Sequence, residues 1–344
     1  MLLNYRLFFL TTLVIISLGF NKLHSQETIP TDSIKPYCDG ANVEEFIENN
    51  KIESLEIKTN NTKKWSRNIL NTMLDLNSAK ERSEHEDWFS FRINKDYKKK
   101  FKSIIIVKFK DKNFTCKFKA RIRITGDLWW HLDWINGNPI SSLHVEITNG
   151  HINSITKFKL FLPKSRFYEN EIFTSLILKE VGFLAPRTFM TEAKINGTKI
   201  NYIFQEDLRK EFLENLMLRE GPILEGDERF TIMLSDDNGE HPEINLSRIV
   251  NKKFSLKNET NAKTALWSVS NLNLLYLQHH QTQKKIQGDK LHINSDRFFK
   301  EKKQRRNHEI YEALIYALDA QHHLSYDDRR FYFERGERCS PPFH

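Results

Sequence analysis

Residues 157–214 run KFKLFLPKSRFYENEIFTSLILKEVGFLAPRTFMTEAKINGTKINYIFQEDLRKEFLE. Polar and apolar residues alternate at its start, which predicts a strand over 158–162. Apolar residues at helical spacing then predict a helix over 168–181, ended by the glycine that follows it. An Asn-Gly pair predicts a hairpin over 188–204, and a helix is expected from Asp207. This order of strand, helix, hairpin and connector decides the fold class that we expect.

The rest of the chain divides into a β-rich front half and a helical back half. The stretches KSIIIVKFK, FTCKFKARIRI and SLHVEI alternate in polarity and predict strands before residue 157. Amphipathic patterns predict helices over 262–280 and 307–321, an acidic loop over 220–230, and a final strand at RRFYFER. The sequence therefore predicts an α+β fold, with a β-rich region over 61–206 and a helical region over 207–344.

The N-terminus indicates export. An apolar run of 14 residues from Leu7 to Phe20 follows a single arginine. It is short for a membrane span, which needs ~20 residues, but is typical of a signal peptide. We expect residues 1–25 to be a signal peptide or an uncleaved membrane anchor, and residues 26–60 to be a linker. Three cysteines are present, and one disulfide or three thiols are both open.

The composition and the absence of common motifs limit the classes of function that we expect. The 344 residues are 39% hydrophobic, which supports a folded core, and carry a formal charge of +8 from 53 basic and 45 acidic residues. The charges are interleaved, which fits a mixed solvated surface or a polyanionic partner, and we expect no nucleic acid partner. No Walker A, GxGxxG, HExxH or GxSxG motif occurs, and only 12 glycines are present, so a glycine-rich phosphate loop is not expected.

Two groups of polar residues could serve phosphoryl transfer, which depends on positioning and charge neutralisation. In the first group, Lys157 and Lys159 lie two apart on a strand and so share one face. Glu171 begins the next helix, where it could hold one of these lysines, and Glu206 follows the hairpin. An ordinary strand and a helix start enriched in glutamate explain this group equally well.

The second group lies near the C-terminus, in LDAQHHLSYDDRRFYF. Asp319 ends a predicted helix and is a candidate catalytic base. Asp328 precedes the final strand and is a candidate metal ligand, and His323 could orient the loop between them. A polar helix end followed by a turn is the alternative for this group.

The order of these parts resembles the CotH kinase family, which is named for a spore-coat protein. The resemblance is carried by KARIRITGD, KFKLFLP, NEIFTSLILKEVGFLAPRTFMTEAKING, FQEDLRKEFLE and RRFYF, over roughly residues 115–344. It implies an atypical protein-kinase-like fold, with a β-rich N-lobe followed by a helical C-lobe. It also implies phosphoryl transfer from ATP, with Mg²⁺ or Mn²⁺, to a hydroxyl of an unknown protein acceptor.

The resemblance assigns a role to each candidate residue. Lys159, or Lys157, is similar to the family's nucleotide lysine, with Glu171 as its helix partner. Glu206 falls at the connector whose backbone receives adenine. Asp319 matches the catalytic Asp, whereas Asp328 stands where the family usually has Asn.

One departure from the family affects the expected activity. The family's second metal-binding Asp follows the next strand, but this sequence ends with RCSPPFH before any such residue. We therefore expect a truncated C-lobe and a protein that is inactive as written. The alternative is a non-catalytic surface or envelope protein for coat or polysaccharide assembly that binds through an aromatic segment over 129–134.

Overall fold

The structure is a computed structural model. It describes residues 37–39, 51–82, 92–110, 115–233, 243–283, 302–318, 330–333 and 342–343.

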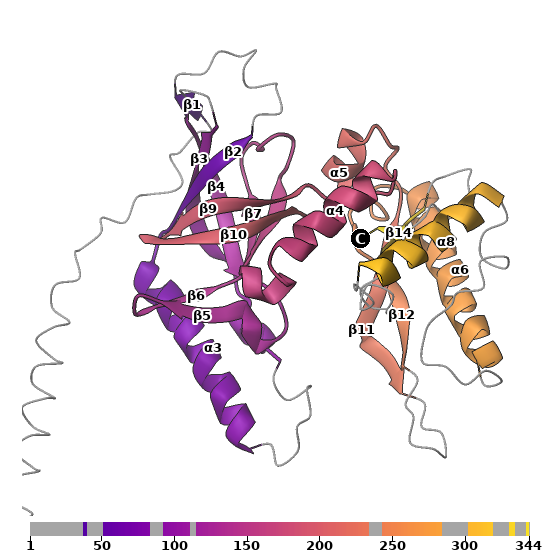
Figure 1. The fold of residues 1–344 in the computed structure, drawn as a ribbon, viewed down its shortest axis with the longest axis horizontal. Coiled ribbons are helices and arrows are strands. Elements are labelled where there is room, and N and C mark those ends of the chain that lie inside the picture. The colour runs from indigo at the N-terminus through magenta and orange to yellow at the C-terminus, as the bar shows by residue number, and fades with distance from the viewer. Residues whose placement is uncertain are drawn as a thin grey trace, which may run out of the picture.

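A closed seven-stranded β-barrel forms the first part of the molecule (Figure 1). Its strands follow one another around the barrel in the order β4, β3, β2, β9, β10, β8 and β7, and β7 pairs with β4 again to close it. All pairs are antiparallel except β2–β9, which is parallel. The strands are β2 (Ile52–Thr59), β3 (Phe101–Phe109), β4 (Thr115–Ile124), β7 (Leu143–Ile147), β8 (Lys157–Phe161), β9 (Thr188–Ile195) and β10 (Thr198–Glu206).

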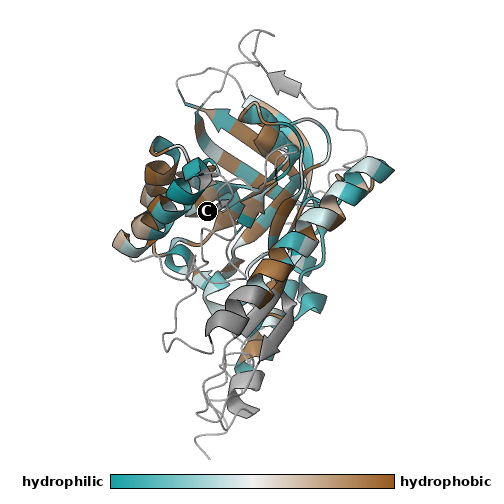
Figure 2. Ribbon diagram, turned by 90° about the vertical axis from the view of Figure 1, so that its right-hand side faces the viewer, coloured by the Kyte–Doolittle hydropathy of each residue, from teal (hydrophilic) through white to brown (hydrophobic). Residues whose placement is uncertain are grey.

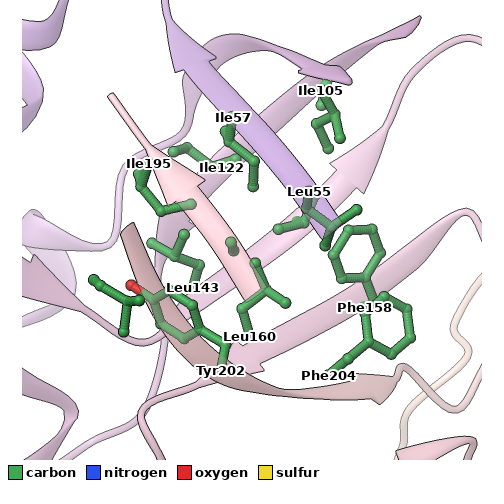
Figure 3. Close-up of a cluster of buried hydrophobic side chains, with 14 of the residues drawn as sticks. Leu55, Ile57, Ile105, Ile122, Leu143, Phe158, Leu160, Ile195, Tyr202 and Phe204 are labelled. Atoms are coloured by element: carbon green, nitrogen blue, oxygen red, sulfur yellow. The ribbon is translucent and has the colours of Figure 1, made fainter. Parts of the chain in front are cut away.

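The barrel interior is filled by apolar side chains. Along β4 every second residue is buried, as expected for a strand with one face in a core, and β8 alternates in the same way up to Leu160. Figure 2 shows the same alternation of hydrophobic and hydrophilic residues along the strands. The close-up in Figure 3 shows ten labelled core residues, namely Leu55, Ile57, Ile105, Ile122, Leu143, Phe158, Leu160, Ile195, Tyr202 and Phe204.

A helix and a small hairpin cover one end of the barrel (Figure 1). Helix α3 (Thr62–Arg82) buries Trp65, Ile69 and Leu76 in the barrel core. It lies beside the hairpin of β5 (Leu132–Ile135) and β6 (Asn138–Ser141), which follows the short helix η5 (Trp129–His131).

The C-terminal part consists of a small sheet with helices. Strands β12 (Glu243–Ile249), β11 (Ile223–Met233), β13 (Arg330–Tyr332) and β14 (Pro342–Phe343) pair in that order. Helix α6 (Glu259–Gln283) packs on this sheet, and helix α5 (Lys210–Asn215) connects it to β10. Helix α8 (Lys302–Ala317) packs on α4 (Glu169–Glu180), which lies between the barrel and the C-terminal sheet (Figure 1).

This architecture corrects the expected fold class. The prediction of a kinase-like β-rich N-lobe followed by a helical C-lobe was wrong. The front half is a closed mixed barrel, and the back half contains a four-stranded sheet. The described residues form only five α-helices in all. The order of elements along a chain does not determine whether a sheet is open or closed, and here the β2–β9 and β4–β7 pairs close it.

Three local differences contributed to this error. Residues 52–59 form β2, although they lie in the range expected to be a linker. The predicted acidic loop contains most of β11, which is the central strand of the C-terminal sheet. The helix expected from Asp207 extends only over Lys210–Asn215. By contrast, the predicted strands at β3, β4, β7, β8 and β9–β10 and the helix at α4 are confirmed.

Candidate functional site

The candidate site is built on a row of polar residues that crosses the outside of the barrel. Strand register places Arg123, His144, Lys159, Gln205 and Thr188 side by side on five consecutive strands. We call these five residues the outer row. Because alternate residues of each strand fill the core, the row is directed away from the interior.

Lys159 lies at the centre of the outer row. Burial lowers the pKa of its ammonium group to about 8, and the charges of Arg330 and Arg166 act in the same direction. Asp207 and Glu225 oppose the shift. Lys159 is therefore a cation at neutral pH that is held close to its titration point, a state found in binding and catalytic sites.

Asp207 is the carboxylate that acts most strongly on this lysine. It lies 3.6 Å from His144 and accepts a hydrogen bond of 2.9 Å from Arg209 Nε. Burial raises its pKa, but the contacts with His144, Arg209 and Lys159 outweigh burial and hold the pKa well below its usual range. Burial lowers the pKa of His144. At neutral pH, Asp207 is thus a fixed negative charge beside a neutral imidazole.

Helix α4 is attached to the outer row by two side-chain hydrogen bonds. Gln205 Nε2 donates to Glu171 Oε1 at 2.6 Å, and Ser175 Oγ donates to Thr188 Oγ1 at 3.1 Å. Gln205 is the register neighbour of Lys159, so this hydrogen bond joins Glu171 to the strand residue beside the lysine that it was predicted to hold. The Lys159–Glu171 pair itself stays a prediction.

The C-terminal sheet brings a charged network to the same lysine. Glu225 of β11 accepts hydrogen bonds from Arg248 of β12 and from Arg330 of β13, the latter at 2.6 Å between Nε and Oε2. The charges of Arg330 and Glu225 both act on Lys159, so elements far apart in the sequence converge there. The site therefore lies where the barrel meets the C-terminal sheet.

Lys157 lies one step along the same face but has its own partner. Its Nζ is 2.9 Å from Glu146, which also pairs with Lys100 at 2.6 Å. Burial raises the pKa of Glu146, but the hydrogen bonds from Lys100 and Lys157 outweigh it and lower the pKa to about 2. Of the two candidate lysines, Lys159 is therefore the one whose charge is available.

Glu206 is buried, and its contacts hold the ends of neighbouring strands together. Its carboxylate forms two hydrogen bonds with Arg187, at 2.7 Å and 2.9 Å, and only 3% of the residue is exposed. Its backbone N–H donates to Arg187 O at 3.1 Å, and the next N–H, that of Asp207, donates to Lys157 O. In the connector predicted to receive adenine, both backbone N–H groups are thus already bonded to carbonyl groups at the ends of neighbouring strands.

The second predicted group lies outside the described residues. Asp319, His323 and Asp328 all fall there, so their positions relative to Lys159 are not part of the structure. Within the described ranges, no group of three or more His, Cys, Asp or Glu side chains could hold a metal ion. Asp207 and Glu225 are each engaged by arginine, so the described residues fit the phosphates of a nucleotide better than they fit its metal.

Sequence reasoning missed several members of this site. His144 and Arg123 join Lys159 only through strand register, which local periodicity does not supply. Asp207 was assigned to a helix although it follows a strand end, where polar residues commonly mark a site. Arg330 and Glu225 reach the site through a sheet that was not predicted.

A second feature is an exposed aromatic surface beside η5. Trp129 and Trp134 are 55% and 52% exposed. Lys164 lies beside the first of them, with its ammonium 6.0 Å from the Trp129 ring centroid and 2.7 Å from Asp133 Oδ2. The aromatic segment expected to be a binding loop thus presents two indole rings next to an ion pair.

No protein-family model matches the chain, and no curated protein matches it. The similarity to the CotH family therefore remains a resemblance carried by the quoted residues. Separately, none of the helices in the described part of the chain has the length and apolar character that crossing a membrane requires.

Proposed function

We propose that the protein binds ATP, together with Mg²⁺ or Mn²⁺, at Lys159, in a site of the type that serves phosphoryl transfer to a hydroxyl of a protein acceptor. The single observation that carries this proposal is the half-buried Lys159 ammonium, set between the α4-linked outer row and the Arg330–Glu225 pair. A cation in such a setting favours a multiply charged phosphate ligand. The proposal concerns the ligand and reaction and is independent of the kinase-like fold.

In this proposal the chain's own residues orient the ligand. Lys159 neutralises phosphate charge, and Glu171 with Gln205 fixes the position of α4 beside it. The nucleotide would supply its terminal phosphoryl group and leave as the diphosphate, and Asp328 is the residue that would hold its divalent metal. Asp319 accepts the proton of the acceptor hydroxyl.

Calorimetric titration with ATP and Mn²⁺ tests the binding step. We expect Lys159→Met to weaken ATP binding at least tenfold, because a charge-assisted interaction contributes roughly 1.5–3 kcal/mol. Lys63→Met is the control, since Lys63 belongs to α3 at the other end of the barrel. Equal affinities for the wild type and Lys159→Met contradict the proposed site.

Transfer of radiolabelled phosphate from ATP tests the reaction. We expect any transfer to disappear in Asp319→Ala and in Lys159→Ala. Transfer that survives both substitutions refutes the assigned roles, whatever the binding experiment shows.

We also propose that the protein is exported, or anchored through its N-terminal segment. The support is Cys116, which is disulfide-bonded and lies opposite Cys38 in the register of β1 (Tyr37–Asp39) with β4. Structural disulfides persist in oxidising compartments and are rare in the cytosol. Cell fractionation with an epitope-tagged chain tests this proposal, and recovery only in the cytosol contradicts it.

A second candidate function is non-catalytic binding of an envelope polysaccharide. Trp129 and Trp134 favour it, because exposed indole rings stack on sugar faces and the adjacent Lys164–Asp133 pair can accept and donate hydrogen bonds. Sedimentation with cell-wall polysaccharide tests this function in Trp129→Ala and Trp134→Ala. Retained sedimentation of the double variant contradicts it.

A further inference from the structure

Two cationic side chains share the ring of Phe161. Lys159 Nζ lies 5.6 Å from the ring centroid, and the guanidinium carbon of Arg166 lies 4.2 Å from it. Both distances are within the range of cation–π attraction. Lys159 comes from β8 and Arg166 from η6 (Pro163–Arg166), the short helix that directly follows this strand.

Neither cation is in direct contact with a carboxylate in the part of the chain that the structure describes, although the charges of Asp207 and Glu225 act on Lys159 from a greater distance. No hydrogen bond or ion pair of Lys159 or of Arg166 occurs there, and Arg166 Nε is buried without an acceptor. Other basic groups nearby, such as Lys157 and Arg209, do have carboxylate partners. Two like charges that share one ring without a directly bonded anion repel each other, so their arrangement requires an explanation.

The position of Arg166 is fixed by the short helix that carries it. Leu162 N donates to Ser142 Oγ at 3.0 Å, and Ser165 Oγ donates to Leu162 O at 2.7 Å. The chain then leaves η6 through Phe167 and Tyr168, both with positive φ values of 50° and 56°. Arg166 is therefore held beside Lys159 before any ligand arrives, which lowers the entropic cost of binding.

We propose that Lys159 and Arg166 form a two-cation site for a phosphate group, with Arg166 binding two of its oxygens and Lys159 a third. The planar guanidinium matches the spacing of phosphate oxygens, and the ammonium adds a point charge. Arg330 brings a further positive charge from the C-terminal sheet. The inference rests on the proposed function in one respect, namely that the phosphate belongs to ATP.

The experiment compares three probes by calorimetry: tripolyphosphate, ATP with Mn²⁺, and adenosine. Arg166→Gln removes the charge, whereas Arg166→Lys keeps the charge but removes the planar guanidinium group. Arg67→Gln removes an arginine on α3 and is the control. We expect Arg166→Gln to lose roughly tenfold or more in affinity for tripolyphosphate and for ATP, with Arg166→Lys intermediate. Arg67→Gln should match the wild type. Adenosine binding should not change in any variant.

The outcomes separate this inference from the proposed function. Tripolyphosphate binding that requires Arg166, without ATP binding, supports the anion site and contradicts the nucleotide function. ATP binding that is equal in Arg166→Gln and the wild type overturns the anion site and leaves the function standing. Binding of neither probe by the wild type overturns both. Circular dichroism and thermal unfolding of each variant without ligand show whether a loss of affinity reflects a loss of folding.

Discussion

His131 and Gly126 are in such close contact that neither residue can easily be replaced. Gly126 has a φ of 87°, and a Cβ atom at this position would overlap the imidazole ring of His131. The imidazole is buried and bonded through Nδ1 to Ser142 Oγ at 3.0 Å, so it cannot move aside without losing that partner. The turn after β4 therefore depends on a residue without a side chain.

This contact predicts that Gly126→Ala lowers the free energy of unfolding by about 3 kcal/mol, from a strained φ plus a steric clash. Gly137→Ala is the matched control, because Gly137 has a φ of 74° but a Cβ atom there would meet nothing within 4 Å. We expect the control to lose only about 1 kcal/mol. Urea unfolding measures both, and equal losses show that the His131 contact contributes nothing.

His131 also predicts a pH dependence of stability. Burial lowers its pKa from 6.5 to about 3, and the charge of Arg166 acts in the same direction. Between these two values the unfolded chain binds a proton that the folded protein does not bind. Stability therefore falls as the pH drops below about 6.5, by up to about 1.4 kcal/mol per pH unit.

The variant His131→Gln removes this titration while keeping a hydrogen-bonding side chain. We expect it to be less stable than the wild type at pH 7 but to lose less stability between pH 6 and pH 5. Urea unfolding at several pH values measures the two slopes. Identical slopes contradict a lowered pKa for His131.

At the residue scale, some residues of the candidate site could be predicted from the sequence. Lys159 and Glu171 could be selected because strand and helix periodicity determine which residues share a face. His144, Asp207 and Arg166 could not, because their importance depends on which strands pair and where a short helix turns. The spacing of residues along the chain predicts neither the strand pairing nor the position of that short helix.

At the element scale, the end of β9–β10 is held by the buried Arg187–Glu206 pair, with Arg187 Nη1 also donating to Asn153 O at 2.8 Å. Removing one partner leaves a buried charge unpaired. We predict that Glu206→Gln costs about 3 kcal/mol in the free energy of unfolding. The double variant Arg187→Met/Glu206→Leu should be more stable than Glu206→Gln alone, because neither charge then remains. Thermal unfolding ranks the variants, and the opposite order contradicts this account.

The pairing of β1 with β4 predicts one particular disulfide. Cys38 lies opposite Cys116 in the register, and Cys116 is disulfide-bonded. We expect peptide mapping without reduction to recover residues 38 and 116 in one cross-linked species. A cross-link that joins Cys116 to Cys339 instead contradicts the pairing.

The strands were predictable from the sequence where their pattern is strong. The alternation in β3, β4 and β8 was sufficient, because each has one buried face. Strand β11 was not, because Glu225 and Asp227 are buried charges that resemble a polar loop until their neighbours in other elements are known. Its identity as a strand depends on neighbours distant in sequence.

At the scale of the whole molecule, α4 joins the barrel to the C-terminal part. One side is hydrogen-bonded to the outer row, and Leu178 packs with Phe183 against Tyr311 and Ile315 of α8. The ring of Phe183 meets that of Tyr311 edge-on, with centroids 5.6 Å apart.

We predict that Phe183→Ala loosens α8 before it affects the barrel. Loss of this buried ring costs roughly 3–5 kcal/mol. Leu176→Ala is the matched control, because Leu176 belongs to α4 and is 53% exposed. Hydrogen-exchange mass spectrometry should show faster exchange in residues 302–318 of Phe183→Ala alone. Unchanged exchange there, or equal acceleration in the control, contradicts the role of this contact.

The parallel β2–β9 pair has a consequence for synthesis of the chain. The barrel is closed where Thr59 N donates to Asn196 Oδ1, across 137 residues of sequence. While the ribosome is still making the intervening segment, β2 has its antiparallel neighbour β3 but no partner on its other edge. An unpaired strand edge readily joins edges of other chains. A nascent chain that has emerged only as far as β8 therefore exposes one edge of β2 to other chains until β9 emerges.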